Sequence, residues 1–335
     1  MKEFLVQENE AGQRLDKLLL KILNKAPKSF IYKMLRKKNI VLNGKKAEGS
    51  EKLEYNDEIK LFLSDETIER FMENIDTTDV GYNSDVKLDI IYEDSHILVI
   101  NKPLGLLSQK ADKDDVSMVE HVISYMLLTK QISKEQMISF KPSICNRLDR
   151  NTSGILIAGK YLLGLQEMAK LLKNRTLGKY YLTIVKGKIL DKKTIEGYLN
   201  KDDYKNIVSI SDIETINSDY ICTEYEPIKN SVILNDNGIK GDYTLLKVKL
   251  ITGRSHQIRG HLASIGHPII GDYKYGDQKT NHYFKSTYGL SHQLLHSYTM
   301  VFPEITGELS YLSGKEFVAK SPTIFENIKI ELFKQ

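Results

Sequence analysis

One carboxylate of the sequence lies where it could take part in chemistry. Asp149 belongs to the segment NRLDRNTSG (146–154), in which it lies between Arg147 and Arg150, ahead of a turn and an apolar strand. A lone aspartate before a turn is usually structural, because its side chain caps the backbone or forms an Asx turn. The two neighbouring arginines favour a catalytic role more, since they keep a carboxylate ionised and can also hold phosphates.

A second segment, GKYYLTIVKG (178–187), places Tyr180 and Tyr181 on a predicted strand. Adjacent strand residues face opposite sides of a sheet, so only one of the two tyrosines can point into a site. A strand tyrosine usually belongs to the core, although an aromatic ring in a cleft can stack on a nucleobase.

A third segment, ITGRSHQIRGHLASIGHPIIGDYKYG (251–276), is rich in histidine and arginine. It predicts a helix with Ser255 as its N-cap and Gly266 at its end. Arg259 on this helix could reach a carboxylate from another segment and form a charge-assisted pair.

The histidines of this segment do not have the spacing of metal ligands. His256 and His261 are off the i,i+4 face, and no HExxH motif or cysteine partner accompanies them. The two cysteines, Cys145 and Cys222, are far apart in the sequence and fit a reducing compartment. We therefore expect no metal.

The N-terminal residues 13–63 predict a compact module of two helices and a short hairpin. Pro27 can open the second helix, and Asn43-Gly44 is a strong turn pair. Nine basic residues and no acidic ones lie from Lys21 to Lys46, which indicates a polyanion-binding patch rather than only a solvated face. The side chains expected to face nucleic-acid phosphates are those of Lys28, Lys33, Arg36, Lys37 and Lys38.

The rest of the chain predicts a linker and one larger domain. Residues 64–87 are acidic and read as a linker with a possible short helix. Residues 88–330 predict strands and helices in irregular alternation, which favours an α+β fold over a parallel doubly wound sheet. No run of the 335 residues is apolar enough to span a bilayer, and the charged start does not resemble a signal peptide, so we expect a cytoplasmic protein.

Four segments in this order, HILVINKPLG, NRLDRNTSG, KYYLTIVKG and GRSHQIRGHLASIGHPIIGD, resemble the RluA-type pseudouridine synthase family. The resemblance covers nearly the whole chain. The stretch APKSFIYKMLRKKNIVLNGKK looks most like the RluC branch, which acts on large-subunit ribosomal RNA, and residues 13–63 resemble a small RNA-binding module of the ribosomal-protein type.

The resemblance implies a catalytic domain with a central mixed or antiparallel sheet, and it implies roles for particular residues. The catalytic aspartate falls on Asp149, the strand tyrosine on Tyr181 and the arginine after Gln-Ile on Arg259. The resemblance also implies that Ile258 adjoins the substrate pocket and that Lys102 belongs to the family's Lys-Pro loop. Together with Arg147 and Arg150, these residues are expected to bind the substrate.

The sequence departs from the family pattern at two positions. Asn146 and Asn151 stand where the family usually has histidine and aspartate. The first change replaces an imidazole with an amide, and the second removes a negative charge near Asp149. Neither alters the aspartate itself, so they bear on fine tuning and on the choice of target.

The implied reaction breaks the N1–C1′ bond of a uridine, turns the uracil and rejoins it through C5. Atoms are conserved and no electrons are transferred, so no cofactor is required. We expect RNA, most simply ribosomal RNA, as the partner of a monomeric enzyme. The alternatives are a non-catalytic RNA-binding or ribosome-assembly protein that retains the fold, and an RNA-cleaving or base-removing hydrolase, which would need a second carboxylate.

Overall fold

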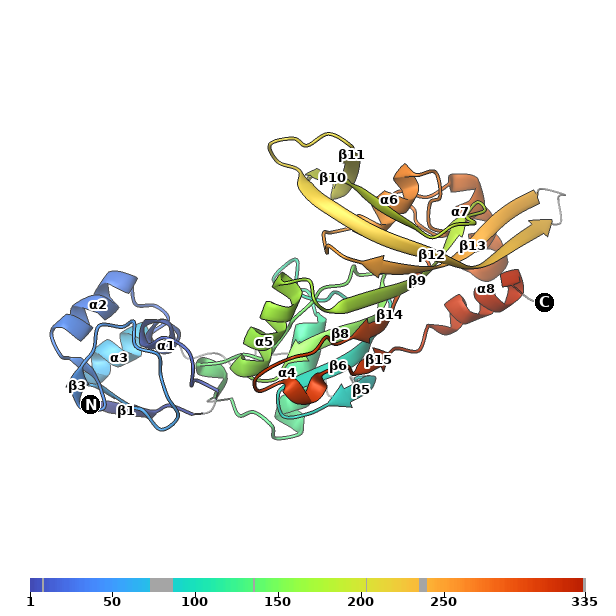
Figure 1. Ribbon diagram of the computed structural model, residues 1–335. Coiled ribbons are helices and arrows are strands. Elements are labelled where there is room, and N and C mark those ends of the chain that lie inside the picture. The colour runs from blue at the N-terminus through green and yellow to red at the C-terminus, as the bar shows by residue number, and fades with distance from the viewer. Residues whose placement is uncertain (8, 73–86, 135, 203, 235–239, 334–335) are drawn as a thin grey trace.

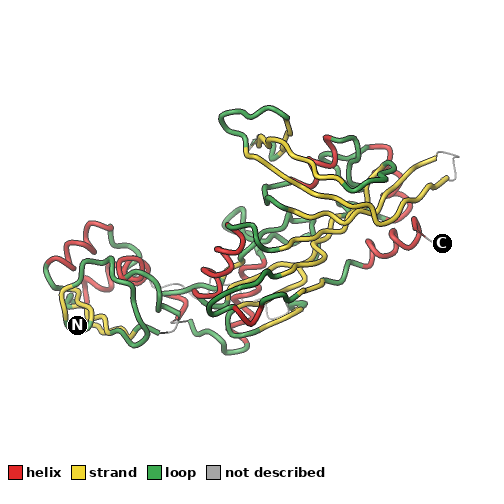
Figure 2. Tube along the Cα trace, in the orientation of Figure 1, coloured by secondary structure: helices red, strands yellow, loops and turns green. Residues whose placement is uncertain are grey.

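The computed structural model (Figure 1) describes residues 1–7, 9–72, 87–134, 136–202, 204–234 and 240–333. Its elements form two sheets, one of four strands near the N-terminus and one of eleven strands in the rest of the chain. Figure 2 shows that helices flank both sheets, so helices and strands are mixed along the chain. The α+β fold class predicted from the sequence is confirmed.

The N-terminal unit packs its helices on a small antiparallel sheet with the order β1-β4-β2-β3. Its core runs from Val6 to Ile68 and therefore extends beyond the predicted limits 13–63. Asn43 and Gly44 have φ angles of 50° and 72°, which form the tight turn predicted between β2 and β3. The elements are β1 (Lys2–Leu5), α1 (Leu15–Ile22), α2 (Lys28–Arg36), β2 (Ile40–Leu42), β3 (Lys45–Lys46), β4 (Glu58–Leu61) and α3 (Asp65–Phe71).

The segment predicted as a linker begins with a helix. In α3, Ser64 caps the N-terminus, and Ile68 and Phe71 pack into the N-terminal core. The rest of the predicted linker, residues 73–86, lies outside the described residues.

The second unit is built on one mixed sheet with the strand order β11-β10-β12-β13-β9-β14-β8-β6-β5, to which β15 and β7 add at β14 and β8. Only the β14–β8 pair is parallel among the described strands. The strands are β5 (Ile90–Glu93), β6 (Ile97–Lys102), β7 (Ser143–Ile144), β8 (Ser153–Gly159), β9 (Gly178–Lys186), β10 (Lys193–Asp202), β11 (Ile207–Ser211), β12 (Asp219–Leu234), β13 (Lys240–Leu250), β14 (Leu295–Val301) and β15 (Glu316–Val318).

Helices cover both faces of this sheet, and strand β9 shows how the faces are separated. Tyr181 and Val185 belong to a core that includes residues of α4 and α6, whereas Leu182 and Ile184 belong to a core that includes residues of α7 and α8. This alternation is the strand period of two. The helices are α4 (Met118–Leu128), η1 (Gln136–Ile138), α5 (Leu162–Lys173), α6 (Gln257–Ser264), α7 (Gln278–Tyr288), η2 (Ser310–Leu312) and α8 (Thr323–Phe333).

Two helix ends test the capping predictions. Ser117 caps α4, and Glu120 completes a capping box with it. The prediction for α6 was wrong, because the residue before the helix is His256, in a left-handed conformation with φ 54°, and not Ser255. Gly266, with φ 82°, follows the end of α6 as expected.

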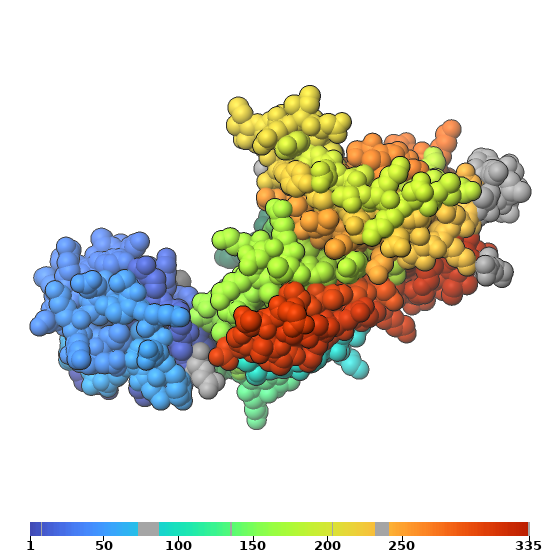
Figure 3. All heavy atoms as spheres, in the orientation of Figure 1, coloured from blue at the N-terminus to red at the C-terminus, as the bar shows by residue number. Residues whose placement is uncertain are grey.

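Among the described residues, no helix is both long and apolar enough to cross a membrane. The end of the sheet around β11, yellow in Figure 3, projects from the body of the molecule.

Gly154 is where the parallel strands β8 and β14 approach each other most closely. It pairs with Ser297, has a φ of 107°, and a Cβ atom at this position would lie 2.1 Å from the Ser297 carbonyl oxygen. Only glycine fits, because both the backbone conformation and the neighbouring backbone exclude a side chain.

We expect Gly154→Ala to lower the free energy of unfolding by about 3 kcal/mol or more, since the clash with backbone adds to left-handed strain. Gly314→Ala is the matched control: its φ is 67°, but nothing lies within 4 Å of the added methyl group. The control should lose only about 1–2 kcal/mol. Urea unfolding measures both, and equal losses would contradict the close approach.

Candidate active site

The loop that carries Asp149 is fixed on both sides of this residue. Before it, the Ser108 hydroxyl donates to the Leu148 carbonyl at 2.7 Å and accepts from the Leu148 N–H at 2.9 Å. After it, the Arg150 carbonyl accepts from the Lys102 ammonium at 3.1 Å and from the Gly105 N–H at 3.0 Å. The loop therefore holds Asp149 in a defined place between β7 and β8.

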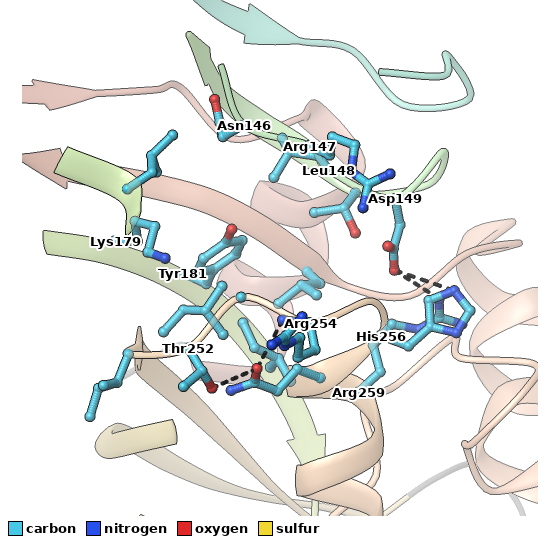
Figure 4. A pocket seen from close by; sticks show the side chains of 18 of the residues that line it. Asn146, Arg147, Leu148, Asp149, Lys179, Tyr181, Thr252, Arg254, His256 and Arg259 are labelled. Atoms are coloured by element: carbon cyan, nitrogen blue, oxygen red, sulfur yellow. Dashed lines mark hydrogen bonds and ion pairs between the residues drawn. The ribbon is translucent and has the colours of Figure 1, made fainter. Parts of the chain in front are cut away.

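Arg259 on α6 binds two carboxylates at once. Its Nε and Nη2 donate to the two oxygens of Asp272 at 2.6 and 2.9 Å, and its Nη1 donates to Asp149 Oδ2 at 2.9 Å. The Asp272 side chain is fully buried, whereas that of Asp149 is 26% exposed. Burial alone would lower the pKa of Arg259, but the hydrogen bonds and charges of Asp272 and Asp149 raise it above its ordinary value. Asp272 thus holds the guanidinium, and Arg259 presents its third donor to Asp149 (Figure 4).

His256 lies near the same oxygen of Asp149 that Arg259 binds. Its Nε2 is 3.8 Å from Asp149 Oδ2, and its Nδ1 is 2.8 Å from the Tyr275 hydroxyl. The Tyr275 oxygen accepts from the Val208 N–H, so its own proton is available for His256 Nδ1. Burial lowers the pKa of His256 although the charge of Asp149 opposes this, which favours a neutral ring with the N–H at Nε2.

A cavity of about 460 Å³ opens next to Asp149. Tyr181, Ile258 and Leu148 are nearly buried and give it apolar walls. Burial raises the pKa of Tyr181 to about 12, so its phenol is neutral at physiological pH. Of the two adjacent strand tyrosines, Tyr181 lines the cavity, whereas the Tyr180 ring contacts Lys247.

The turn that leads into α6 is fixed by Gln257. Its side-chain oxygen accepts from the Thr252 hydroxyl at 2.8 Å and from the Arg254 N–H at 3.0 Å. Its side-chain nitrogen donates to the Cys222 carbonyl and to the Thr223 hydroxyl, both at 3.0 Å. Because Gln257 is two positions before Arg259, this network sets the start of the helix that aims the guanidinium.

Arg147 and Arg150, which flank Asp149 in the sequence, do not lie against its carboxylate as the sequence predicted. Arg147 and Arg150 are exposed, and within the described part of the chain the ion pairs of Asp149 are with Arg259 and His256 instead. Arg150 lies 3.8 Å from Asp115. Both arginines line a larger cavity of about 820 Å³ that also reaches Asp149. They line this cavity but do not pair with the carboxylate.

The prediction that Lys102 binds substrate is at odds with its position. Its side chain is fully buried, and its ammonium donates to the carbonyls of Pro103, Leu106 and Arg150 at 2.9, 2.7 and 3.1 Å. Burial lowers the pKa of Lys102 to about 8. Three backbone acceptors occupy the ammonium, so Lys102 joins two loops instead of facing the cavity.

The structure also adds residues that the sequence did not single out. Asp272 and Tyr275 come from GDYKYG, which follows α6 closely enough to fold back on it, but nothing in that segment showed which acid would reach Arg259. The predicted RNA-facing cations of α2 and its C-terminal end are all exposed. No cluster of three or more metal-ligating side chains occurs within the described residues.

Comparison with known proteins identifies the family. Residues 96–264 match the family described as RNA pseudouridylate synthase. An uncharacterized RNA pseudouridine synthase of Mycoplasma genitalium is 32% identical over 308 residues, 90% of each chain. A ribosomal large subunit pseudouridine synthase C of Haemophilus ducreyi is 30% identical over 303 residues, 89% of this chain and 87% of that one. The solved structure of human RNA pseudouridylate synthase domain containing 4 has a TM-score of 0.54 at 21% identity, over 72% of this chain and 91% of that one.

The chain therefore belongs to the RluA-type family of RNA pseudouridine synthases and is an isomerase. Within that family it is RluC-like, as the sequence indicated. The enzyme class argues against the non-catalytic RNA-binding alternative.

Replacing Asp272 and Asp149 in turn tests which of the two carboxylates bound to Arg259 stabilises the fold. Asp272→Asn leaves a buried guanidinium short of its main counter-charge, so the free energy of unfolding should fall by about 3–5 kcal/mol. Asp149→Asn is the control, since Arg259 keeps Asp272 and Asp149 is partly exposed; it should lose less than about 1 kcal/mol. Chemical denaturation of both variants measures the difference. Equal losses would show that Asp272 is not the structural anchor.

Proposed function

We propose that this enzyme converts uridine to pseudouridine in large-subunit ribosomal RNA and that Asp149 is its catalytic carboxylate. The observation that carries the proposal is the environment of Asp149. Among the described residues that line the two adjoining cavities, it is the only carboxylate, and Arg259 holds it from a buried position. The apolar walls next to it suit a nucleobase.

The reaction needs one carboxylate at the sugar. When the N1–C1′ bond breaks, C1′ becomes electron-poor, and Asp149 either forms a bond to the sugar or stabilises its positive charge. Arg259 and His256 hold the carboxylate toward the cavity at 2.9 and 3.8 Å. A hydrolase would instead need a second carboxylate to activate water. The described lining of these cavities supplies none, which supports isomerisation.

The uracil must turn while it is detached. Tyr181 and Ile258 flank the cavity from β9 and α6, so the base would lie between an aromatic ring and an aliphatic side chain. These walls hold the base through its faces and leave it free to rotate in its own plane. They also keep water away from the electron-poor sugar.

The cavity of about 820 Å³ would take the RNA around the target. Its cations include Arg147, Arg150, Arg254 and Lys274, which suit phosphates. A uridine must leave its stack to reach Asp149, which favours loops and bulges of structured RNA. Ribosomal RNA as the substrate is supported by relatives named ribosomal large subunit pseudouridine synthase C.

The N-terminal unit would contribute affinity. The cations of α2 and its C-terminal end are exposed and lie in an acid-free stretch of the sequence, so they suit contacts with RNA phosphates that do not depend on base identity.

The decisive test of the site is Asp149→Asn. We expect pseudouridine formation in single-turnover assays on large-subunit ribosomal RNA to fall by at least about four orders of magnitude, because the charge and the nucleophile are both lost. RNA binding should be kept, since phosphate contacts come from Lys and Arg side chains. Turnover within about tenfold of wild type would exclude Asp149 as the catalytic group. Wild type that modifies only other RNAs would overturn the ribosomal assignment.

The role of α2 can be tested without removing the unit. In Lys33→Gln/Arg36→Gln/Lys37→Gln, RNA affinity should weaken and the dependence of log affinity on log salt should become shallower by up to about 2–3. The single-turnover rate at saturating RNA should stay within about twofold of wild type, because these side chains hold RNA and do not act on the uridine. An unchanged salt slope would argue against RNA contacts at α2.

A further inference from the structure

Lys179 shares the cavity with Asp149 and Tyr181. It is two residues before Tyr181 on β9, so the two side chains point to the same face of the strand, about 7 Å apart along it. Both line the cavity of about 460 Å³. In Figure 4 the Tyr181 ring lies between Lys179 and Asp149. The cavity thus has an anion at one end, a cation toward the other and an aromatic ring between them.

The Lys179 ammonium has no acidic partner. Among the described residues it makes no ion pair or hydrogen bond, and the charge that acts on it is that of Arg175. A methyl group added to Gly253 would lie 3.5 Å from the ammonium nitrogen, which places this nitrogen at the wall formed by the turn before α6. Burial, and secondarily Arg175, lower the pKa of Lys179. An unpaired, half-buried cation lowers the stability of the fold, so its presence in this cavity points to a functional role.

The chemistry of the reaction provides such a reason. When N1–C1′ breaks, the bonding electron pair stays with N1, and its charge spreads over the uracil O2 and O4. With the sugar at Asp149 and the base over Tyr181, the edge of the uracil that carries O2 and O4 would lie on the Lys179 side of the cavity. A cation that meets charge only as it develops stabilises the transition state more than the ground state.

We propose that Lys179 is a catalytic residue that binds a carbonyl oxygen of the uracil and stabilises the negative charge it gains on cleavage. The proposal rests on the proposed function of this site. The step is balanced: the sugar's positive charge is met by Asp149 and the uracil's negative charge by Lys179. The C5–C1′ bond then forms with an electron pair from uracil, and the C5 proton is lost while N1 gains one.

Binding of a backbone phosphate is the other role open to a lysine here. Phosphates are better served by the exposed cations of the larger cavity, such as Arg147, Arg150 and Lys274. Lys179 is less exposed than these arginines and lies beyond the ring of Tyr181 from Asp149. Its position therefore favours the base.

The test compares Lys179→Met with Lys179→Arg and with Lys247→Met. Lys247 is on the neighbouring strand β13 but on the opposite face, where it is exposed and contacts the ring of Tyr180. Single-turnover rates at saturating RNA, RNA affinity at several salt concentrations and thermal melting are measured on the RNA that wild type modifies.

Lys179→Met should lose about 10²–10³-fold in rate, as is typical when one donor to a developing oxyanion is removed. Its RNA affinity should stay within about twofold and its Tm should not fall, since an unpaired buried charge is gone. Lys179→Arg should keep more rate than Lys179→Met, and Lys247→Met should match wild type.

Three results would overturn the proposal. One is a Lys179→Met rate within about threefold of wild type. Another is weaker binding with a salt slope shallower by about one, which would show a phosphate contact. The third is a lower Tm in Lys179→Met together with a wild-type rate in Lys179→Gln. Glutamine is neutral but keeps a hydrogen-bond donor, so this result would show that the positive charge is not needed. Failure of the ribosomal assignment would show in wild type, whereas failure of the Lys179 role would show only in the variants.

Discussion

The site depends on one guanidinium that is held by two carboxylates. Arg259 is 7% exposed, and a cation at that depth is tolerable only because Asp272, fully buried, binds it through two parallel hydrogen bonds. That pair leaves Nη1 free, and this nitrogen donates to Asp149 at 2.9 Å. Asp149 is therefore positioned by Arg259, whose charge is already balanced by Asp272. Asp149 can change its bonding during a reaction without leaving Arg259 unpaired.

The rest of the unit brings Asp149 and Arg259 together. Asp149 precedes β8 and Arg259 lies on α6, 110 residues later in the chain. Gly154 allows β8 to lie parallel to β14 at close range, which fixes the loop before it. Gln257 fixes the turn before α6. Lys102 and Ser108 hold the backbone on either side of Asp149. Each of these groups limits how far the Asp149 carboxylate can move.

The sequence predicts turns and helix ends better than it predicts which side chains will contact one another in the folded chain. The Asn43-Gly44 turn and the end of α6 at Gly266 depend on a few neighbouring residues, and both were predicted correctly. The family motifs also led to Asp149 and Arg259, which the structure joins. The positions of Lys102 and Asp272 could not be predicted in this way, because the sequence does not show which groups a buried charge contacts once the chain has folded. Three carbonyls decide the position of Lys102, and Arg259 decides that of Asp272.

The departure from the family pattern at Asn146 is explained by two hydrogen bonds that its side chain makes with β8. Its amide nitrogen donates to the Ile155 carbonyl at 3.2 Å, and its amide oxygen accepts from the Ile157 N–H at 2.8 Å. One planar group thus spans two residues of β8 and holds the segment that leads to Asp149 against that strand. A neutral imidazole also has one donor and one acceptor, but they lie on separate ring nitrogens that point apart. The asparagine therefore fixes the position of the loop that carries Asp149.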